Sequence, residues 1–404
     1  MPIFDLSHIR QSFPLIEQEA RSGRVYLDNA ATTQKPEVVI KAVEAFYHSS
    51  NANVHRAAHH LSTEATLRYE AARDSVKNFL NAQHREEIVW TSGATEAINL
   101  VVQTYGRRFL QEGDEVVLSL LEHHSNIVPW QLLVQEKGIK LRFLEPDDEG
   151  RVSIDQIRSV IGDRTKFVSV TQMANATGDI LPLKDIIERA HEVSARVLID
   201  GSQGIAHESV DVQALNCDFY VFSGHKIYAP TGIGALYGRY ELLEIMPPWK
   251  GGGEMIDRVS LHGTTFALPP LRFEAGTPNI AGVIGLGAAI EWLATIDRTS
   301  AFEYERHLRR TMVSLCQEVP GFRLIGHNED TSILSFIVEG SHPQDLGTLL
   351  DMQGVALRVG HHCAMPLMES LKLNGTLRAS IALYNTTDEV VHFASALKKA
   401  VTEF

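Results

Sequence analysis

The chain is short of cysteine: 404 residues contain three thiols, at Cys217, Cys316 and Cys363. An odd number of widely spaced cysteines argues against a secreted disulfide framework and favours a reducing compartment. No apolar stretch reaches the length of a transmembrane helix. The start, Met1-Pro2-Ile3-Phe4-Asp5, lacks the basic-then-apolar pattern of a signal peptide. We therefore expect a cytoplasmic protein that does not associate with a membrane.

Basic residues are also fewer than acidic residues. Lys and Arg together number 37 against 50 Asp and Glu, which gives a formal net charge of −13. This balance disfavours non-specific binding to nucleic acid or to anionic lipid. Hydrophobic residues make up 44% of the chain, enough to bury a large core. These values are typical of a globular protein, and the length allows two or three domains.

The hydrophobic pattern predicts an α/β fold. Between about Val25 and Trp292, strand-like apolar runs alternate with helical segments, which favours an open, mostly parallel sheet covered on both faces. From about residue 293 the pattern changes to that of a smaller α+β domain. We expect a large domain at 22–292 and a small domain made of 1–21 and 293–404. The predicted strands are 87–91, 115–120, 140–144, 166–171, 196–200 and 219–222.

A lysine follows the last of these strands, in Ser223-Gly224-His225-Lys226. A rigid strand end gives such an amine a fixed position and an open crevice, which suits a Schiff base with an aldehyde cofactor. Taken alone, a solvated surface lysine explains Lys226 as well. Asp200 ends the preceding strand and is placed to pair with the ring nitrogen of a pyridine cofactor. An Asp-Gly turn is the structural alternative for Asp200.

Further candidates lie after other strands. Ser92-Gly93-Ala94-Thr95 opens a helix, where free N–H groups and the Thr95 hydroxyl suit an anion, although an ordinary helix start fits nearly as well. His123 is suited to stacking on a cofactor ring and to proton transfer. With Asn175 and Gln203, all these residues follow carboxyl ends of predicted strands, the edge where doubly wound folds bind ligands.

Two candidates lie in the predicted small domain. Cys363 stands in a polar loop with Arg358 and two histidines, where a lowered pKa would make its thiolate reactive. A half-buried structural thiol is the alternative. Arg378 is suited to bind a substrate carboxylate through two parallel hydrogen bonds, or it forms an ordinary surface ion pair. A zinc site is disfavoured, because the candidate ligands show neither C-x-x-C nor H-E-x-x-H spacing. These candidates are His123, His124, His361, His362 and Cys363. We therefore expect no metal.

Several motifs together resemble a known family. Nearly the whole chain is similar to the pyridoxal-phosphate-dependent cysteine desulfurases of aminotransferase class V, and the short R-x-G-x-H-C loop resembles their group II (SufS/CsdA-like) branch. The motifs are Tyr26–Thr32, Asn53–Arg56, Thr91–Glu96, Glu122–Asn126, Asp200–Gln203, Ser223–Lys226, Phe273–Pro278 and Arg358–Cys363. The chain departs from these relatives at Met365 and over 254–262.

The resemblance implies fold type I of pyridoxal 5'-phosphate enzymes, with a mostly parallel seven-stranded sheet in the large domain. It also implies a role for each site residue. Lys226 carries the cofactor and moves protons, while His123 stacks on the ring. The other cofactor contacts are Asp200, Gln203, Ala94, Thr95, Ser223, His225 and, from a second subunit, Thr277. The substrate contacts are Asn175 and Arg378 for the carboxylate, with His55, Arg56 and Arg358 at the entrance.

The same resemblance implies an activity. L-cysteine becomes L-alanine, Cys363 receives the sulfur as a persulfide, and a SufE/CsdE-like acceptor protein takes it on, for iron–sulfur clusters or other sulfur-containing cofactors. The resemblance also implies a homodimer, and it leaves L-selenocysteine open as a substrate. A non-catalytic scaffold of the same fold is the main alternative. Kynurenine cleavage or amino-acid epimerisation is a third reading, but neither reaction needs a nucleophilic thiol such as that of Cys363.

Overall fold

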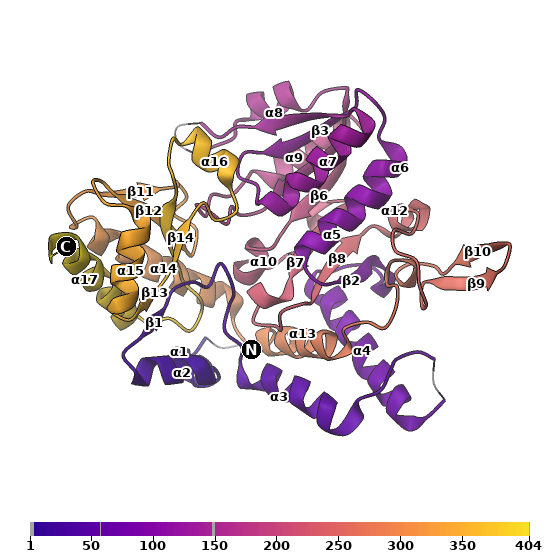
Figure 1. The fold of residues 1–404 in the computed structure, drawn as a ribbon, viewed down its shortest axis with the longest axis horizontal. Helices are drawn as coiled ribbons and strands as arrows, with labels where there is room; N and C mark the ends of the chain where they lie inside the picture. Colours follow the sequence, from indigo (N-terminus) through magenta and orange to yellow (C-terminus); the bar gives the residue numbers. More distant parts are fainter. Residues whose placement is uncertain (1–3, 57, 148–149, 404) are drawn as a thin grey trace.

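The computed structural model describes residues 4–56, 58–147 and 150–403. Figure 1 shows a large sheet with its helices in one part of the molecule and a smaller sheet with its own helices in the other. The larger sheet has seven strands. In sheet order they are β2 (Ile88–Thr91), β8 (Gly234–Gly238), β7 (Phe219–Ser223), β6 (Arg196–Asp200), β5 (Thr165–Thr171), β3 (Glu115–Ser119) and β4 (Lys140–Leu144).

The seven-stranded, mostly parallel sheet expected from the sequence is confirmed. Strands β7, β6, β5, β3 and β4 pair in parallel, and only β8 runs against its neighbours β2 and β7. The six predicted runs all became strands. Strand β8 was not among them, because Gly234 and Gly238 at its two ends interrupt the apolar pattern.

Alternating side chains of the large sheet point to its two opposite faces. In β3, Val117 packs into one core cluster, whereas Val116 and Leu118 pack into another. Both faces are therefore covered, as expected. Helices α4 (His60–Phe79), α9 (Leu183–Glu192) and α13 (Ile280–Leu293) contribute to the first cluster, and α5 (Ala94–Val101) and α7 (Val128–Lys137) contribute to the second.

The smaller sheet is antiparallel throughout. Its order is β11 (Phe322–Ile325), β12 (Ile333–Val338), β15 (Thr376–Ser380) and β14 (Arg358–Gly360). One apolar cluster joins it to α14 (Arg298–Cys316), α15 (Pro343–Met352) and α17 (Thr387–Glu403). Beside it, β1 (Val25–Tyr26) pairs in parallel with β13 (Val355–Ala356), so the start of the chain contacts its last third.

The remaining helices are short. They are α1 (Leu6–Gln11), α2 (Pro14–Arg21), α3 (Glu37–Ala45), α6 (Arg107–Phe109), α8 (Ile154–Val160), α10 (Gly204–His207), α11 (Val212–Leu215), α12 (Tyr240–Ile245) and α16 (Met365–Ser370). Single turns of 3-10 or π type lie at 46–50, 85–87, 102–106, 124–126, 224–226 and 271–273. Among the described residues, no single helix passes a length-and-hydropathy test for a membrane span; α13 and α14 pass only as a pair bent by 86°.

A separate two-stranded hairpin projects from the large-sheet side of the molecule (Figure 1). It consists of β9 (Ile256–Ser260) and β10 (Gly263–Phe266), paired antiparallel. Its side chains are largely exposed, and Leu261 at the tip is fully exposed. An isolated hairpin of this size is at best marginally stable in water.

Gly201, which directly follows β6, tests how tightly side chains pack at the carboxyl ends of the large sheet's strands. A Cβ at this position would overlap the buried ring of Tyr220, whose hydroxyl bonds Gln172 Oε1 at 2.6 Å. We expect Gly201→Ala to lower the free energy of unfolding by about 1–3 kcal/mol, because the core must shift to admit the methyl group. Urea unfolding measures this change. Gly251→Ala is the matched control, since no atom lies within 4 Å of its added Cβ; equal stability losses in both variants would contradict the packing argument.

Candidate active site

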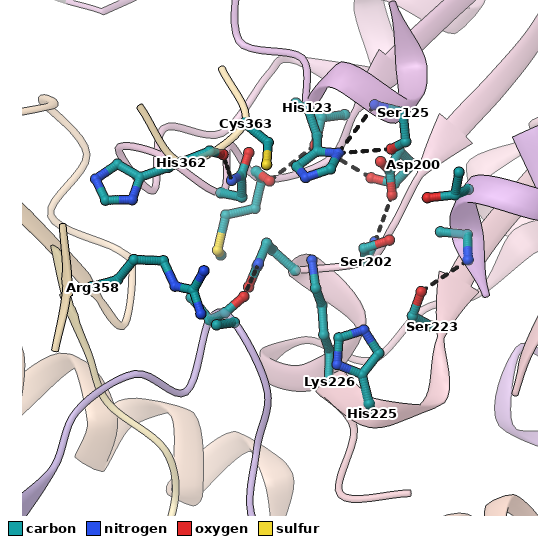
Figure 2. A pocket seen from close by; sticks show the side chains of 18 of the residues that line it. His123, Ser125, Asp200, Ser202, Ser223, His225, Lys226, Arg358, His362 and Cys363 are labelled. Atoms are coloured by element: carbon teal, nitrogen blue, oxygen red, sulfur yellow. Dashed lines mark hydrogen bonds between the residues drawn. The ribbon is translucent and has the colours of Figure 1, made fainter. Parts of the chain in front are cut away.

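A pocket of about 230 Å³ opens where the large sheet meets the smaller one. Figure 2 shows Cys363 and His123 on one side of it, with Lys226 and His225 on the other. Most of the residues singled out from the sequence line this pocket. They are Ala94, Thr95, His123, Asn175, Asp200, Gln203, Ser223, His225, Lys226, Arg358, Cys363 and Arg378.

Three of the sequence candidates lie outside the pocket of this chain. Thr277 is exposed. His55 pairs through Nε2 with Glu70 Oε1 at 3.0 Å, and Arg56 pairs through Nε with Glu254 Oε1 at 2.8 Å. The site roles expected for these residues, including those that need a second subunit, stay predictions.

Lys226 ends the 3-10 turn that follows β7, so the sheet fixes the start of its side chain. The surrounding protein excludes water from the amine, and this burial, together with the charge of Arg378, lowers the pKa of Lys226 to about 8. The negative charge of Asp200 opposes the shift. A neutral amine is the nucleophilic form. Lys226 is therefore a nucleophile over a pH range in which an ordinary lysine is protonated.

Asp200 ends β6 and His123 follows β3, two strands on either side of β5 in the large sheet. Asp200 is buried, and its Oδ1 accepts a hydrogen bond from the Ser202 amide at 3.0 Å. His123 Nδ1 accepts the Ser125 amide at 3.1 Å, so the neutral ring carries its proton on Nε2. Burial, together with the nearby charge of Lys226, lowers the pKa of His123 to about 4, although Asp200 opposes the shift. The imidazole is therefore neutral at physiological pH.

The start of α5 forms a cradle for an anion. Its N-cap, Gly93, offers no side-chain acceptor, so most first-turn N–H groups keep their capacity to donate. The Ala94 amide bonds Ser223 Oγ at 2.8 Å, which brings the hydroxyl of Ser223 to the same corner. Thr95 and His225 line it as well. Burial and the charges of Lys226 and Lys35 lower the pKa of His225 to about 4.

Cys363 follows the edge strand β14 and is the exposed thiol of the chain. The other two thiols are buried, and burial raises the pKa of Cys316 to about 12 and raises that of Cys217 as well. A thiolate is therefore disfavoured at both buried positions. Only Cys363 combines exposure with a place in the pocket.

Arg378 lies on β15 and is buried. Its Nη1 donates to the Asn175 carbonyl at 2.7 Å, and its Nη2 lies 3.5 Å from Asp28 Oδ1. The Nε of Arg378 and the Oδ1 of Asn175 are buried and have no hydrogen-bond partner among the residues that the structure describes. Unsatisfied polar atoms beside a pocket are expected where a polar ligand completes them. Burial lowers the pKa of Arg378 to about 10, so it remains cationic at neutral pH.

The structure adds residues that sequence reasoning missed. Asp28 forms a two-point ion pair with Arg358, with Nη2 to Oδ2 at 2.9 Å and Nε to Oδ1 at 3.1 Å. Thr33 donates its amide to the His225 carbonyl at 3.0 Å, and Lys35 Nζ lies 3.3 Å from the same oxygen. The contacts of Thr33 and Lys35 with this carbonyl hold the turn that ends at Lys226. The motif Tyr26–Thr32 marked part of this segment, but nothing in its spacing indicated these partners.

Comparison with known proteins agrees with the geometry. A family model, Aminotransferase class-V, matches residues 25–393. A cysteine desulfurase of Synechococcus elongatus is 48% identical over 402 residues, 99% of this chain and 64% of that protein, so the chain spans less than two thirds of that relative. A probable cysteine desulfurase of Vibrio cholerae is 46% identical over 400 residues, 99% of each chain. The crystal structure of the cysteine desulfurase CsdA of Escherichia coli superposes with a TM-score of 0.94 at 44% identity, covering 100% of both chains.

The residues present fit the cofactor of this family, pyridoxal 5'-phosphate. The pocket supplies a nucleophilic amine at Lys226, a buried acid at Asp200 and an uncapped helix start beside Ser223. These three features match the aldehyde, the ring nitrogen and the phosphate respectively. With a family match from residue 25 to residue 393, this chain belongs to the pyridoxal-phosphate-dependent aminotransferase class V family.

Proposed function

We propose that this protein is a cysteine desulfurase. It converts L-cysteine to L-alanine and leaves the sulfur on Cys363 as a persulfide. The observation that carries the proposal is one pocket lined by the nucleophilic amine of Lys226, the exposed thiol of Cys363 and the incompletely bonded guanidinium of Arg378. The names of its relatives, cysteine desulfurase and probable cysteine desulfurase, support it.

The proposed roles divide along the pocket. The bound cofactor withdraws electrons from the substrate's α-carbon. Lys226 binds the cofactor and moves protons, Asp200 holds its ring nitrogen, Gln203 its ring hydroxyl, and the neutral ring of His123 stacks on it and exchanges protons. The phosphate contacts are the Ala94 amide, Thr95, Ser223, His225 and Thr277 of a second subunit. Arg378 and Asn175 fix the substrate carboxylate, and His55, Arg56 and Arg358 line the entrance.

In the proposed reaction, sulfur passes from the substrate to Cys363 in one displacement step. The Cys363 thiolate attacks the sulfur of the substrate, a sulfur–sulfur bond forms, and the carbon–sulfur bond breaks. The electron pair of the broken bond stays with the substrate carbon, which takes up a proton. L-cysteine and the Cys363 thiol are thereby converted to L-alanine and a Cys363 persulfide, with no external oxidant or reductant.

The wider setting belongs to the same proposal. A SufE/CsdE-like acceptor takes the persulfide sulfur, which supplies iron–sulfur clusters or other sulfur-containing cofactors, and L-selenocysteine is a candidate second substrate. A homodimer is supported by the projecting hairpin, because the exposed Val259, Leu261 and Phe266 lack a covering surface within the described residues. The alternative, a non-catalytic scaffold, predicts a protein that binds no cofactor.

The first test replaces the proposed nucleophile. We expect Cys363→Ala to keep the visible absorbance of the bound cofactor and to lose L-alanine formation from L-cysteine by about a thousandfold or more. Cys316→Ala is the control, because it removes a buried thiol outside the pocket. Full desulfurase activity in Cys363→Ala would refute the assigned chemistry, and a colourless wild-type protein that cannot be reconstituted would favour the scaffold.

The second test concerns the amine. Because burial lowers the pKa of Lys226 to about 8, its neutral fraction rises through pH 8. We expect the rate at which cofactor-free protein captures pyridoxal phosphate to rise up to about pH 8 and then level off. Stopped-flow absorbance measures the rate. A rate that still climbs about tenfold per pH unit up to pH 10 would indicate an ordinary lysine and contradict the burial argument.

A further inference from the structure

The loop that carries Cys363 has an unusual backbone. His362 and Cys363 are consecutive and both have positive φ angles, +52° and +55°. Residues other than glycine rarely adopt this left-handed conformation, because the Cβ approaches the following carbonyl oxygen. A strained pair of this kind persists only where surrounding contacts hold it. The contacts that hold this loop therefore decide where the thiol lies.

One of those contacts comes from the smaller sheet, where His362 Nε2 lies 2.8 Å from Thr376 Oγ1 of β15. Three others come from the large-sheet side of the pocket. Asn175 Nδ2 donates to the His362 carbonyl at 2.6 Å. The amide of His124 donates to the Cys363 carbonyl at 2.7 Å. The Nε2 of the same histidine accepts the amide of Met365 at 2.9 Å. His124 thus bonds the loop on both sides of Ala364, once through its backbone and once through its side chain.

The residue before Met365 offers no side-chain acceptor for the Met365 amide. Met365 is the first residue of α16, and the N-cap Ala364 has no side-chain oxygen. Helix N-termini leave N–H groups that require a partner, which a serine, threonine or aspartate cap normally supplies. Here a histidine distant in the sequence replaces the local cap. The start of α16, and with it the strained turn before it, depends on that imidazole.

The imidazole can accept only while Nε2 carries no proton. Burial lowers the pKa of His124, and the neighbouring His361 lowers it further, so the neutral form prevails at neutral pH. The titratable residues that approach it are His123 on its own segment, and His361 and Cys363 on the loop. Protonation of Nε2 would convert the acceptor into a donor and break the bond to Met365.

We propose that His124 is a positioning residue for Cys363: by capping α16 in place of Ala364, its side chain fixes the left-handed turn that presents the thiol to the pocket. The inference rests on the proposed function for the role of Cys363. It concerns a neighbour of His123 that the sequence indicated only as a disfavoured zinc ligand.

The experiment compares three holoenzyme variants. His124→Ala removes the acceptor. His124→Gln places an amide oxygen near the position of Nε2 and does not titrate. His48→Ala is the control, because His48 is an exposed histidine whose described ion pair is with Glu44 at 3.5 Å. Hydrogen exchange of the Met365 amide reports the cap directly, and steady-state kinetics with L-cysteine reports the placement of the thiol.

In His124→Ala we expect the protection of the Met365 amide to fall about tenfold. We also expect kcat to fall about tenfold or more with KM nearly unchanged, because the substrate carboxylate contacts do not involve His124. His124→Gln should restore both. Mild acid should weaken the protection in the wild type but not in His124→Gln.

Unchanged Met365 protection in His124→Ala, or failure of glutamine to restore it, would overturn the proposal. Normal kcat despite lost protection would overturn it too, because the thiol would then not depend on the cap. Failure of the proposed function is distinguishable: Cys363→Ala would remain active while the exchange result at Met365 stayed as expected.

Discussion

The site depends on a dehydrated amine. A lysine in water is almost entirely protonated at neutral pH and reacts slowly with an aldehyde, so the loss of solvent around Lys226 makes its amine more reactive. The protein around the amine excludes water, and Lys226 shares the lining of the pocket with buried Asp200 from the larger sheet and buried Arg378 from the smaller one. Neither sheet alone would enclose the amine. The joint between the two sheets therefore forms the pocket in which the proposed reaction takes place.

Buried polar contacts define that joint. His207, just after the Asp200–Gln203 turn, bonds Glu305 Oε2 through Nδ1 at 2.6 Å and Ser332 Oγ through Nε2 at 2.9 Å. Asn29 Nδ2 donates to the Ser380 carbonyl at 2.6 Å. Apolar surfaces tolerate sliding, whereas a buried hydrogen bond is lost when partners shift by an ångström or two. Contacts of this type fix one relative position of the two sheets, and so one distance between Lys226 and Cys363.

Features of this structure that depend on neighbouring residues could be predicted from the sequence, whereas contacts between residues far apart in the chain could not. Strands depend on local periodicity, so the predicted runs at 196–200 and 219–222 became β6 and β7. Residues at strand ends were predictable because parallel strands share an edge. Asp28 and Lys35 were not, since their partners lie hundreds of residues away and leave no periodic pattern. The division into domains at 22–292 and at 1–21 with 293–404 stays a prediction.

The two reactive groups differ in how firmly the fold holds them. Lys226 comes after a strand flanked on both sides in the sheet centre, whereas Cys363 comes after β14, an edge strand bonded only to β15. An edge strand has fewer hydrogen bonds to restrain the loop at its end. In the proposed reaction the cofactor-binding amine stays in place, whereas the thiol collects sulfur inside the pocket and delivers it outside, which requires it to move. A thiol placed after an edge strand suits both needs of that reaction, because few strand hydrogen bonds hold its loop while the contacts from Asn175 and His124 position it at the pocket.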